Sequence, residues 1–121
     1  MEMKPINLVE KFGLFSEHWA PKIIARMNDY QFKLVKFKGE FVWHNHPDTD
    51  EAFIVFNGRM AIHFRDGEVS VGPGEMFVVP KGIEHKTSAE TECQAMLVEI
   101  AGTVNTGQVI DQKTAPIDTW V

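Results

Sequence analysis

The stretch GEFVWHNHPDTDE, from Gly39 to Glu51, decides the fold. It holds two histidines, His44 and His46, that are separated by one residue. Residues i and i+2 of a strand point to the same face of a sheet, so both imidazoles are predicted to project together. Glu51 follows a predicted turn at residues 47–50 and begins the next strand, and a hairpin there would bring its carboxylate beside the two imidazoles.

A fourth residue of the same chemical kind, His85, follows the turn Pro80-Lys81-Gly82 and would close the site from another strand. Three neutral imidazoles and one carboxylate form a nitrogen and oxygen ligand set. Such a set suits divalent first-row metals, namely Fe, Mn, Ni, Zn or Cu. Four protein ligands leave an octahedral ion two positions for water or substrate, so the ion would be available for chemistry.

These residues resemble the two motifs of the cupins, small β-barrel proteins of the jelly-roll type. The first cupin motif, G-x5-H-x-H-x(3,4)-E-x6-G, is similar to the run Gly39-x4-His44-Asn45-His46-x4-Glu51-x6-Gly58. The second, G-x5-P-x-G-x2-H-x3-N, is similar to Gly74-x5-Pro80-Lys81-Gly82-x2-His85, with Ala89 in the place of the asparagine. Gly39 stands one residue closer to His44 than the motif asks, which should affect a turn and not the ligands.

The resemblance implies an all-β fold, the cupin double-stranded β-helix or jelly-roll barrel, with a divalent transition metal on His44, His46, Glu51 and His85. Cupins include dioxygenases, isomerases and lyases, but also storage proteins and sugar-sensing domains. The leading expectation is therefore a metal-dependent enzyme acting on a small molecule, in which Glu51 serves as a base once it is displaced from the ion. The alternatives are a module that binds or senses a small molecule or metal without turnover, and a barrel that the ion merely braces.

Strand patterns surround the motifs. Short apolar or alternating runs separated by turn residues every 8 to 12 positions are typical of a sandwich or barrel. The predicted strands are residues 31–38, 51–56, 59–65, 75–79 and 94–100, and the turns are Asn57-Gly58, Asp66-Gly67, Gly72-Pro73-Gly74 and Lys81-Gly82. The predicted lining of the barrel interior is Phe53, Val55, Met60, Phe77 and Met96.

The two ends of the chain differ from this middle part. Apolar residues at spacings of three and four predict a short amphipathic helix over Ile6–Phe15, with Asn7 as its cap and Gly13 as its stop. We expect residues 1–20 to form this helix and a lead-in, and residues 21–101 to form a single cupin barrel. Residues 102–121 would be a C-terminal extension that is either loose or packed across the barrel.

Three further residues have a structural interpretation. His63 alternates with Met60, Ile62 and Phe64, so it is predicted to point away from the buried face as an exposed or interface histidine. Trp43 faces opposite to His44 and is predicted to serve in core or dimer packing. Cys93 lies in a polar stretch with no histidine nearby in the sequence, and we interpret it as a bystander.

Composition limits the partners of the chain. Its 121 residues suit one domain, and 17 acidic against 12 basic residues give a net charge of −5, which argues against nucleic acid or anionic membranes as partners. The single Cys93 excludes an intramolecular disulfide, and the N-terminus lacks the pattern of a signal peptide, so a cytoplasmic location is the simplest expectation. We also expect a homodimer, with candidate interface residues Trp19, Ile23, Ile24, Ala61 and His63.

Overall fold

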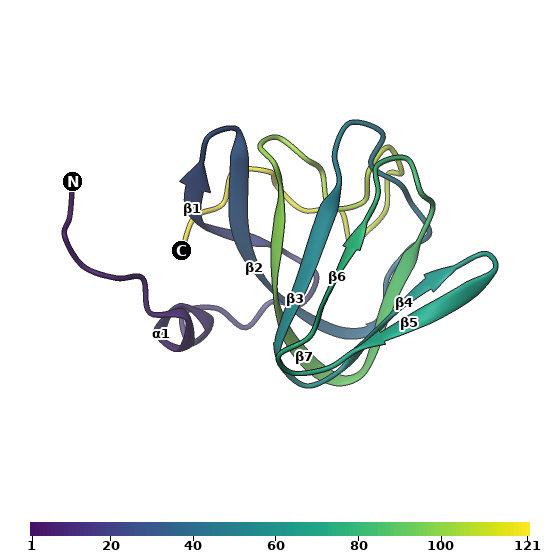
Figure 1. Ribbon diagram of the computed structural model, residues 1–121, viewed down its shortest axis with the longest axis horizontal. Coiled ribbons are helices and arrows are strands. Elements are labelled where there is room, and N and C mark those ends of the chain that lie inside the picture. The colour runs from purple at the N-terminus through teal and green to yellow at the C-terminus, as the bar shows by residue number, and fades with distance from the viewer.

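The computed structural model describes residues 1–121 and contains one short helix and seven strands (Figure 1). The elements in chain order are α1 (Leu8–Phe12), β1 (Lys22–Met27), β2 (Tyr30–Glu40), β3 (Glu51–Asn57), β4 (Met60–Phe64), β5 (Gly67–Val71), β6 (Met76–Val79) and β7 (Lys86–Ile100). The fold is all-β with a single short helix, as the sequence predicts.

The longest strand, β7, holds the barrel together. Its 15 residues pair with β2 along most of their length, with β3 through the C-terminal half and with β4 through the N-terminal part. All pairings are antiparallel, the main order is β1-β2-β7-β3-β6, and β4 continues to β5. Because one strand pairs with both halves of the molecule, the sheet curls around a single core.

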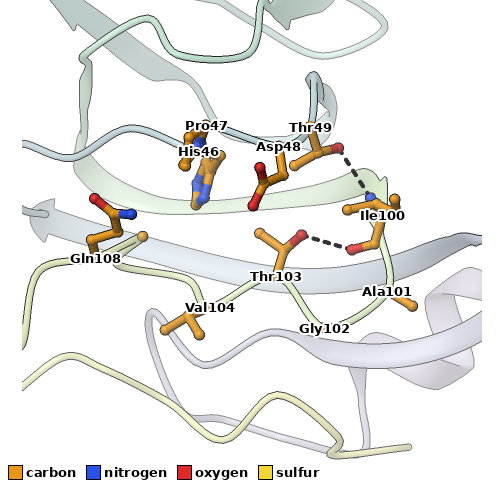
Figure 2. A pocket seen from close by; sticks show the side chains of 11 residues that line it. His46, Pro47, Asp48, Thr49, Ile100, Ala101, Gly102, Thr103, Val104 and Gln108 are labelled. Carbon is orange, nitrogen blue, oxygen red and sulfur yellow. Dashed lines mark hydrogen bonds between the residues drawn. The ribbon is translucent and has the colours of Figure 1, made fainter.

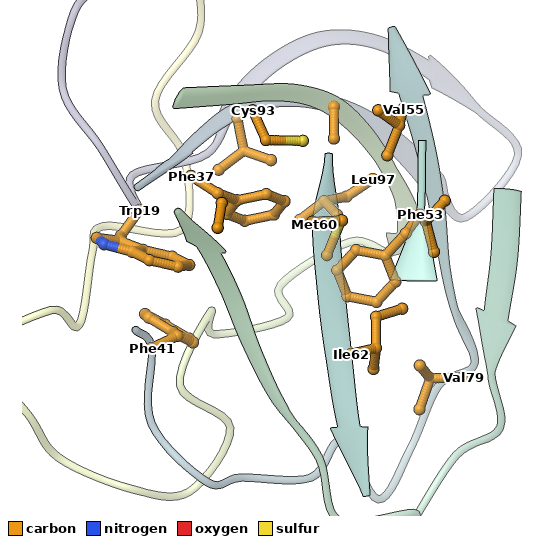
Figure 3. Close-up of a cluster of buried hydrophobic side chains, with 14 residues drawn as sticks. Trp19, Phe37, Phe41, Phe53, Val55, Met60, Ile62, Val79, Cys93 and Leu97 are labelled. Atoms are coloured by element: carbon orange, nitrogen blue, oxygen red, sulfur yellow. The ribbon is translucent and has the colours of Figure 1, made fainter. Parts of the chain in front are cut away.

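That core is a cluster of 14 buried residues inside the barrel (Figure 3). Phe53, Val55 and Met60 belong to it as predicted, and Phe77 packs against it from a partly buried position. The prediction for Met96 is wrong. Its neighbours Ala95 and Leu97 point into the barrel, and the two-residue period of the strand turns Met96 to the outer face.

On that outer face a second, smaller cluster forms around Phe12, Ile24 and Leu34, with Met96 packed against it. Phe12 comes from α1, whose cap is Asn7: the Asn7 side chain accepts a hydrogen bond of 2.9 Å from the backbone N–H of Glu10. The helix is shorter than the predicted Ile6–Phe15. No helix is long and apolar enough to cross a membrane.

The polar stretch before residue 94 is part of β7 and not a loop. Its side chains alternate, so that Thr87, Ala89 and Cys93 are buried while their neighbours are more exposed. Cys93 is completely buried in the core cluster, which corrects its expected polar surroundings. Burial raises the pKa of its thiol to about 11, so the reactive thiolate is disfavoured and the bystander interpretation holds.

The C-terminal extension packs across the barrel. The backbone N–H of Ile23 donates to the carbonyl of Thr119 at 2.8 Å, and that of Val121 donates to the carbonyl of Ile23 at 3.1 Å. Thr106 is fully buried. Figure 1 shows the C-terminus lying beside β1. Of the two possibilities left open by the sequence, the packed one is therefore confirmed.

The same packing corrects part of the expected dimer interface. Trp19, Ile23 and Ile24 are all buried within their own chain, at 7%, 1% and 8% exposure. Trp19 belongs to the barrel core, and Ile24 belongs to the cluster beneath α1. These three side chains are therefore not available to a second copy of the chain.

Two turn glycines give a matched test of the packing at the base of the barrel. Gly58 and Gly74 have φ of 76° and 79°, but only at Gly58 would an added Cβ overlap the carbonyl oxygen of Glu92 on β7. We expect Gly74→Ala to cost only the left-handed backbone penalty of about 1–2 kcal/mol, and Gly58→Ala to cost clearly more. Urea unfolding of both variants measures the difference, and equal free energies of unfolding would contradict this register of β7.

Candidate metal centre

The four predicted ligands converge at one end of the barrel. His44 and His85 are joined by a short backbone bridge, in which the N–H of each donates to the carbonyl of the other, at 3.0 and 2.9 Å. Glu51 is the first residue of β3, and His46 lies in the loop that joins the bridge residue His44 to β3. One ligand atom from each of the four side chains lies within 4.8 Å of all the others, and all four residues are buried.

The route by which these residues meet differs from the predicted hairpin. The segment that carries the histidines pairs with the segment of His85 and not with β3. β3 instead pairs with β6 and β7, which brings Glu51 to the same end of the barrel. His44 and His46 therefore do not lie on one regular strand. His44 is a bridge residue, and His46 reaches the same site from the loop that follows it.

Backbone carbonyls fix two of the imidazole rings. His44 Nδ1 donates to the carbonyl of Val42 at 2.8 Å, and His85 Nδ1 donates to the carbonyl of Ile83 at 2.9 Å. A carbonyl oxygen only accepts hydrogen bonds, so the proton of a neutral ring sits on Nδ1. The Nε2 lone pair of each ring is then free to bind a metal, which is the arrangement typical of metal-binding histidines.

Three buried atoms of this cluster have no hydrogen-bond partner. They are His46 Nε2, His85 Nε2 and Glu51 Oε1. Glu51 Oε1 lies 3.5 Å from His46 Nε2 and 3.4 Å from His85 Nε2. An unpaired buried polar atom costs about 1–3 kcal/mol, and three in contact call for a compensating group. A divalent cation satisfies all three at once, so the residues present fit a metal ion.

The electrostatics of the cluster favour the protonation states that a metal needs. Burial, with the neighbouring His85 ring as the next cause, lowers the pKa of His44 from 6.5 to about 4, so this ring is neutral at pH 7. Burial would by itself raise the pKa of Glu51, but the adjacent His46 and His85 rings outweigh it and hold that pKa well below its usual value. A neutral imidazole and an ionised carboxylate are the ligand forms of these side chains.

A buried hydrogen-bonded pair behind Glu51, formed by Lys33 and Glu99, was not anticipated from the sequence. Lys33 Nζ donates to Glu99 Oε1 at 3.0 Å, and both side chains are almost completely buried. Burial and the neighbouring Glu51 carboxyl raise the pKa of Glu99 well above its usual value, although Lys33 opposes the change. The positions of both residues along their strands could have indicated this burial. Lys33 lies at a spacing of two residues from the inward-pointing Val35 and Phe37. Glu99 lies at the same spacing from the inward-pointing Ala95 and Leu97.

A cavity of about 350 Å³ opens beside His46, between the loop at residues 46–49 and the start of the C-terminal extension (Figure 2). Asp48 is its only charged lining side chain. Thr49 and Thr103 brace its walls through hydrogen bonds to the backbone of Ile100, at 3.2 and 2.7 Å. The lining residues are His46, Pro47, Asp48, Thr49, Ile100, Ala101, Gly102, Thr103, Val104, Gly107 and Gln108.

The other residues singled out in the sequence lie away from the cluster. His63 points to the outer face of β4, where it is half-buried and bonds to the Ser88 hydroxyl at 2.7 Å, as its alternation predicts. Trp43 also lies outside the barrel core. Its ring is covered by the guanidinium of Arg65 at 3.8 Å, so it packs against a cation within the same chain.

Comparisons with known proteins agree with the fold and the motif. The family model for the cupin domain matches residues 33–101. The uncharacterized protein YdbB of Bacillus subtilis is 39% identical over 94 residues, which cover 77% of this chain and 83% of YdbB.

Two solved structures are similar to the chain as well. A cupin-2 domain containing protein from Shewanella frigidimarina has 58% identity and a TM-score of 0.78, covering 78% of this chain and 93% of that one. Protein NMB1881 from Neisseria meningitidis has 38% identity and a TM-score of 0.74, covering 80% of this chain and 99% of that one.

The lowered pKa of His44 makes the stability of the metal-free protein depend on pH. The unfolded chain takes up a proton near pH 6.5 and the folded chain only near 4, so the contribution of His44 is complete above about pH 6.5 and is lost as the pH falls towards 4. We expect a loss of about 3 kcal/mol over that interval in the presence of a chelator. Urea unfolding at several pH values measures it.

The control for this experiment is a pair of variants. His44→Gln should flatten the dependence between pH 6.5 and 4, whereas His63→Gln should keep it, because His63 lies on the outer face. A pH dependence that survives unchanged in His44→Gln would show that another group causes it.

Proposed function

The chain belongs to the cupin family, and we propose that it is a metal-dependent enzyme that acts on a small molecule. The observation that carries the proposal is the set of three unpartnered buried atoms on His46, His85 and Glu51. Leaving such atoms unpaired costs stability, so the arrangement is explained by what it binds. Four protein ligands would leave an octahedral ion two positions for water or substrate, as expected of a site used for chemistry.

The residues of this chain would have different roles in such a site. His44, His46 and His85 present neutral nitrogen donors, and the carbonyls of Val42 and Ile83 hold two of the rings in place. When bound, the ion supplies Lewis acidity towards a carbonyl, enolate or carboxylate, or redox chemistry with dioxygen if it is iron. Glu51 would hold the ion through its carboxylate, which its low pKa keeps ionised, and Oε1 would be the atom that accepts a proton from a bound molecule.

The cavity beside His46 supports a small molecule as the reacting partner. Its volume of about 350 Å³ is within the range of small-molecule sites. The one charged group in its lining is the carboxylate of Asp48, so the cavity suits a neutral or cationic molecule better than an anion.

A binding or sensing module is the second candidate function. The observation that favours it is the scarcity of free acid and base groups beside the ligands. Glu99, the carboxyl group beside Glu51, is already paired with Lys33. Turnover separates the two functions, since an enzyme consumes its ligand and a sensor returns it unchanged.

The metal site is tested by two histidine variants compared side by side. We expect one divalent ion per chain in protein purified without added metal, as measured by elemental analysis. His46→Ala should lose more than the 10- to 100-fold in affinity that changes to outer-shell partners typically cost, because it removes a ligand. His63→Ala should keep its metal, because His63 lies on the outer face of β4. If His63→Ala empties the site and His46→Ala does not, the assignment of ligands is wrong.

We also propose a homodimer, formed through the outer face of β3 and β6. β6 ends the main sheet and carries Met76 and Val78, which are 58% and 45% exposed, next to Phe56 on β3 at 41%. Exposed apolar side chains on an edge strand are typical of an interface between chains. Sedimentation at micromolar concentration should give twice the chain mass, and Val78→Lys should shift it to 13.8 kDa. A wild-type mass near 13.8 kDa would contradict the dimer.

A further inference from the structure

A second cavity adjoins the metal ligands from inside the barrel, and it is very small. His44 and Glu51 line it, and its volume is about 20 Å³. One water needs about 10–15 Å³ of such space, so the cavity is of the size of a water or a diatomic molecule. Its other walls include Trp19, Phe37, Phe41 and Asn105.

Trp19 is the largest side chain in these walls, and it comes from the lead-in before β1 and not from the sheet. Its ring stacks on Phe41, with centroids 4.8 Å apart and planes at 17°, and contacts Phe37 at 5.1 Å. Figure 3 shows Trp19 beside Phe37 and Phe41 at the edge of the core cluster. Phe41 in turn meets the His44 ring edge-on at 5.3 Å. The indole therefore occupies space that would otherwise adjoin the metal ligands.

The backbone of Trp19 is held in an unfavourable conformation. Its φ of 67° lies in the left-handed region, which is uncommon for a bulky residue and costs energy unless the surroundings impose it. Three hydrogen bonds impose it here. The Trp19 N–H donates to Lys36 O at 2.9 Å and Nε1 donates to Lys38 O at 3.1 Å. The Trp19 carbonyl accepts from Asn105 Nδ2 of the C-terminal extension, also at 2.9 Å.

We propose that Trp19 sets the size of the ligand that reaches the inner side of the metal centre, and that Asn105 positions it there. This inference rests on the proposed metal site. The molecule that meets His44 and Glu51 from within the barrel is then of the size of water or a diatomic gas. A larger molecule is confined to the cavity beside His46, which no other ligand of the ion lines.

Binding of two probes to Co²⁺-loaded protein tests the proposal through the visible absorption of the ion. Cyanide, which is diatomic, should change the spectrum of both the wild type and Trp19→Ala. Imidazole, a five-membered ring, should bind the wild-type ion in one step, from the cavity beside His46, and the ion of Trp19→Ala in a second step as well, which a titration followed through the spectrum resolves. Asn105→Ala, which keeps every aromatic ring, should show a second imidazole step that is weaker than that of Trp19→Ala. The matched control is Trp120→Ala, because Trp120 is half-exposed on the C-terminal segment, and it should behave as the wild type does.

The outcomes separate this inference from the metal site itself. If the titration of Trp19→Ala shows no second imidazole step beyond that of the wild type, Trp19 does not select ligands, although the metal site stands. If the wild type binds no Co²⁺, the proposed function and this inference both fail. Trp19→Gly provides a second variant should Trp19→Ala not fold, because glycine adopts a φ of 67° without strain. Circular dichroism checks the folding of each variant.

Discussion

Two backbone hydrogen bonds between His44 and His85 are the constraint on which the candidate site depends. They join two segments that lie far apart in the sequence, and they do so at the residues that carry two of the ligands. The bridge leaves the local carbonyls of Val42 and Ile83 free to accept the Nδ1 protons. Backbone pairing thus fixes both the position and the protonated nitrogen of these rings before any ion binds.

The residues of this site lower the stability of the barrel. Buried polar atoms without partners weaken a fold, and three of the five in this structure lie on His46, His85 and Glu51 at one end of an apolar core. The Lys33–Glu99 pair adds two buried ionisable groups immediately behind Glu51. Such pairs contribute little net stability when they are buried, so their presence here points to the needs of the site more than to those of the fold. Apolar contacts of β2, β3 and β7 supply the stability that these groups do not.

The spacing of the histidines, Glu51 and the turn glycines was enough to predict the fold and the cluster of four ligands. These features are local: a His-x-His pair, a turn and a cap residue such as Asn7 act within a few positions. The face of each strand was harder to predict. In β2 both faces are buried, so the alternation of apolar and polar side chains disappears, and Lys33 looks like a surface residue. The period of β7 turns Met96 outward, because Ala95 and Leu97 occupy the inner positions.

The parts that could not be predicted depend on contacts between distant segments. Nothing near Trp19 in the sequence indicates that it enters the barrel, since its partners lie on β2 and in the C-terminal extension. The packing of that extension likewise depends on Thr119 and Val121 meeting β1 at Ile23. The local sequence pattern does not predict contacts between distant segments. For the four ligands the cupin motif does predict them, because the motif residues recur together on this fold.

X-ray absorption at the edge of the bound metal tests the central claim most directly, because it reads the ligands themselves. The account predicts a first shell of nitrogen and oxygen at about 2.0–2.2 Å, with the outer-shell scattering of three imidazole rings and no sulfur. Loss of one imidazole from that pattern in His46→Ala would assign the third ring. A first shell of oxygen alone, without imidazole scattering, would contradict a metal centre built on His44, His46, Glu51 and His85.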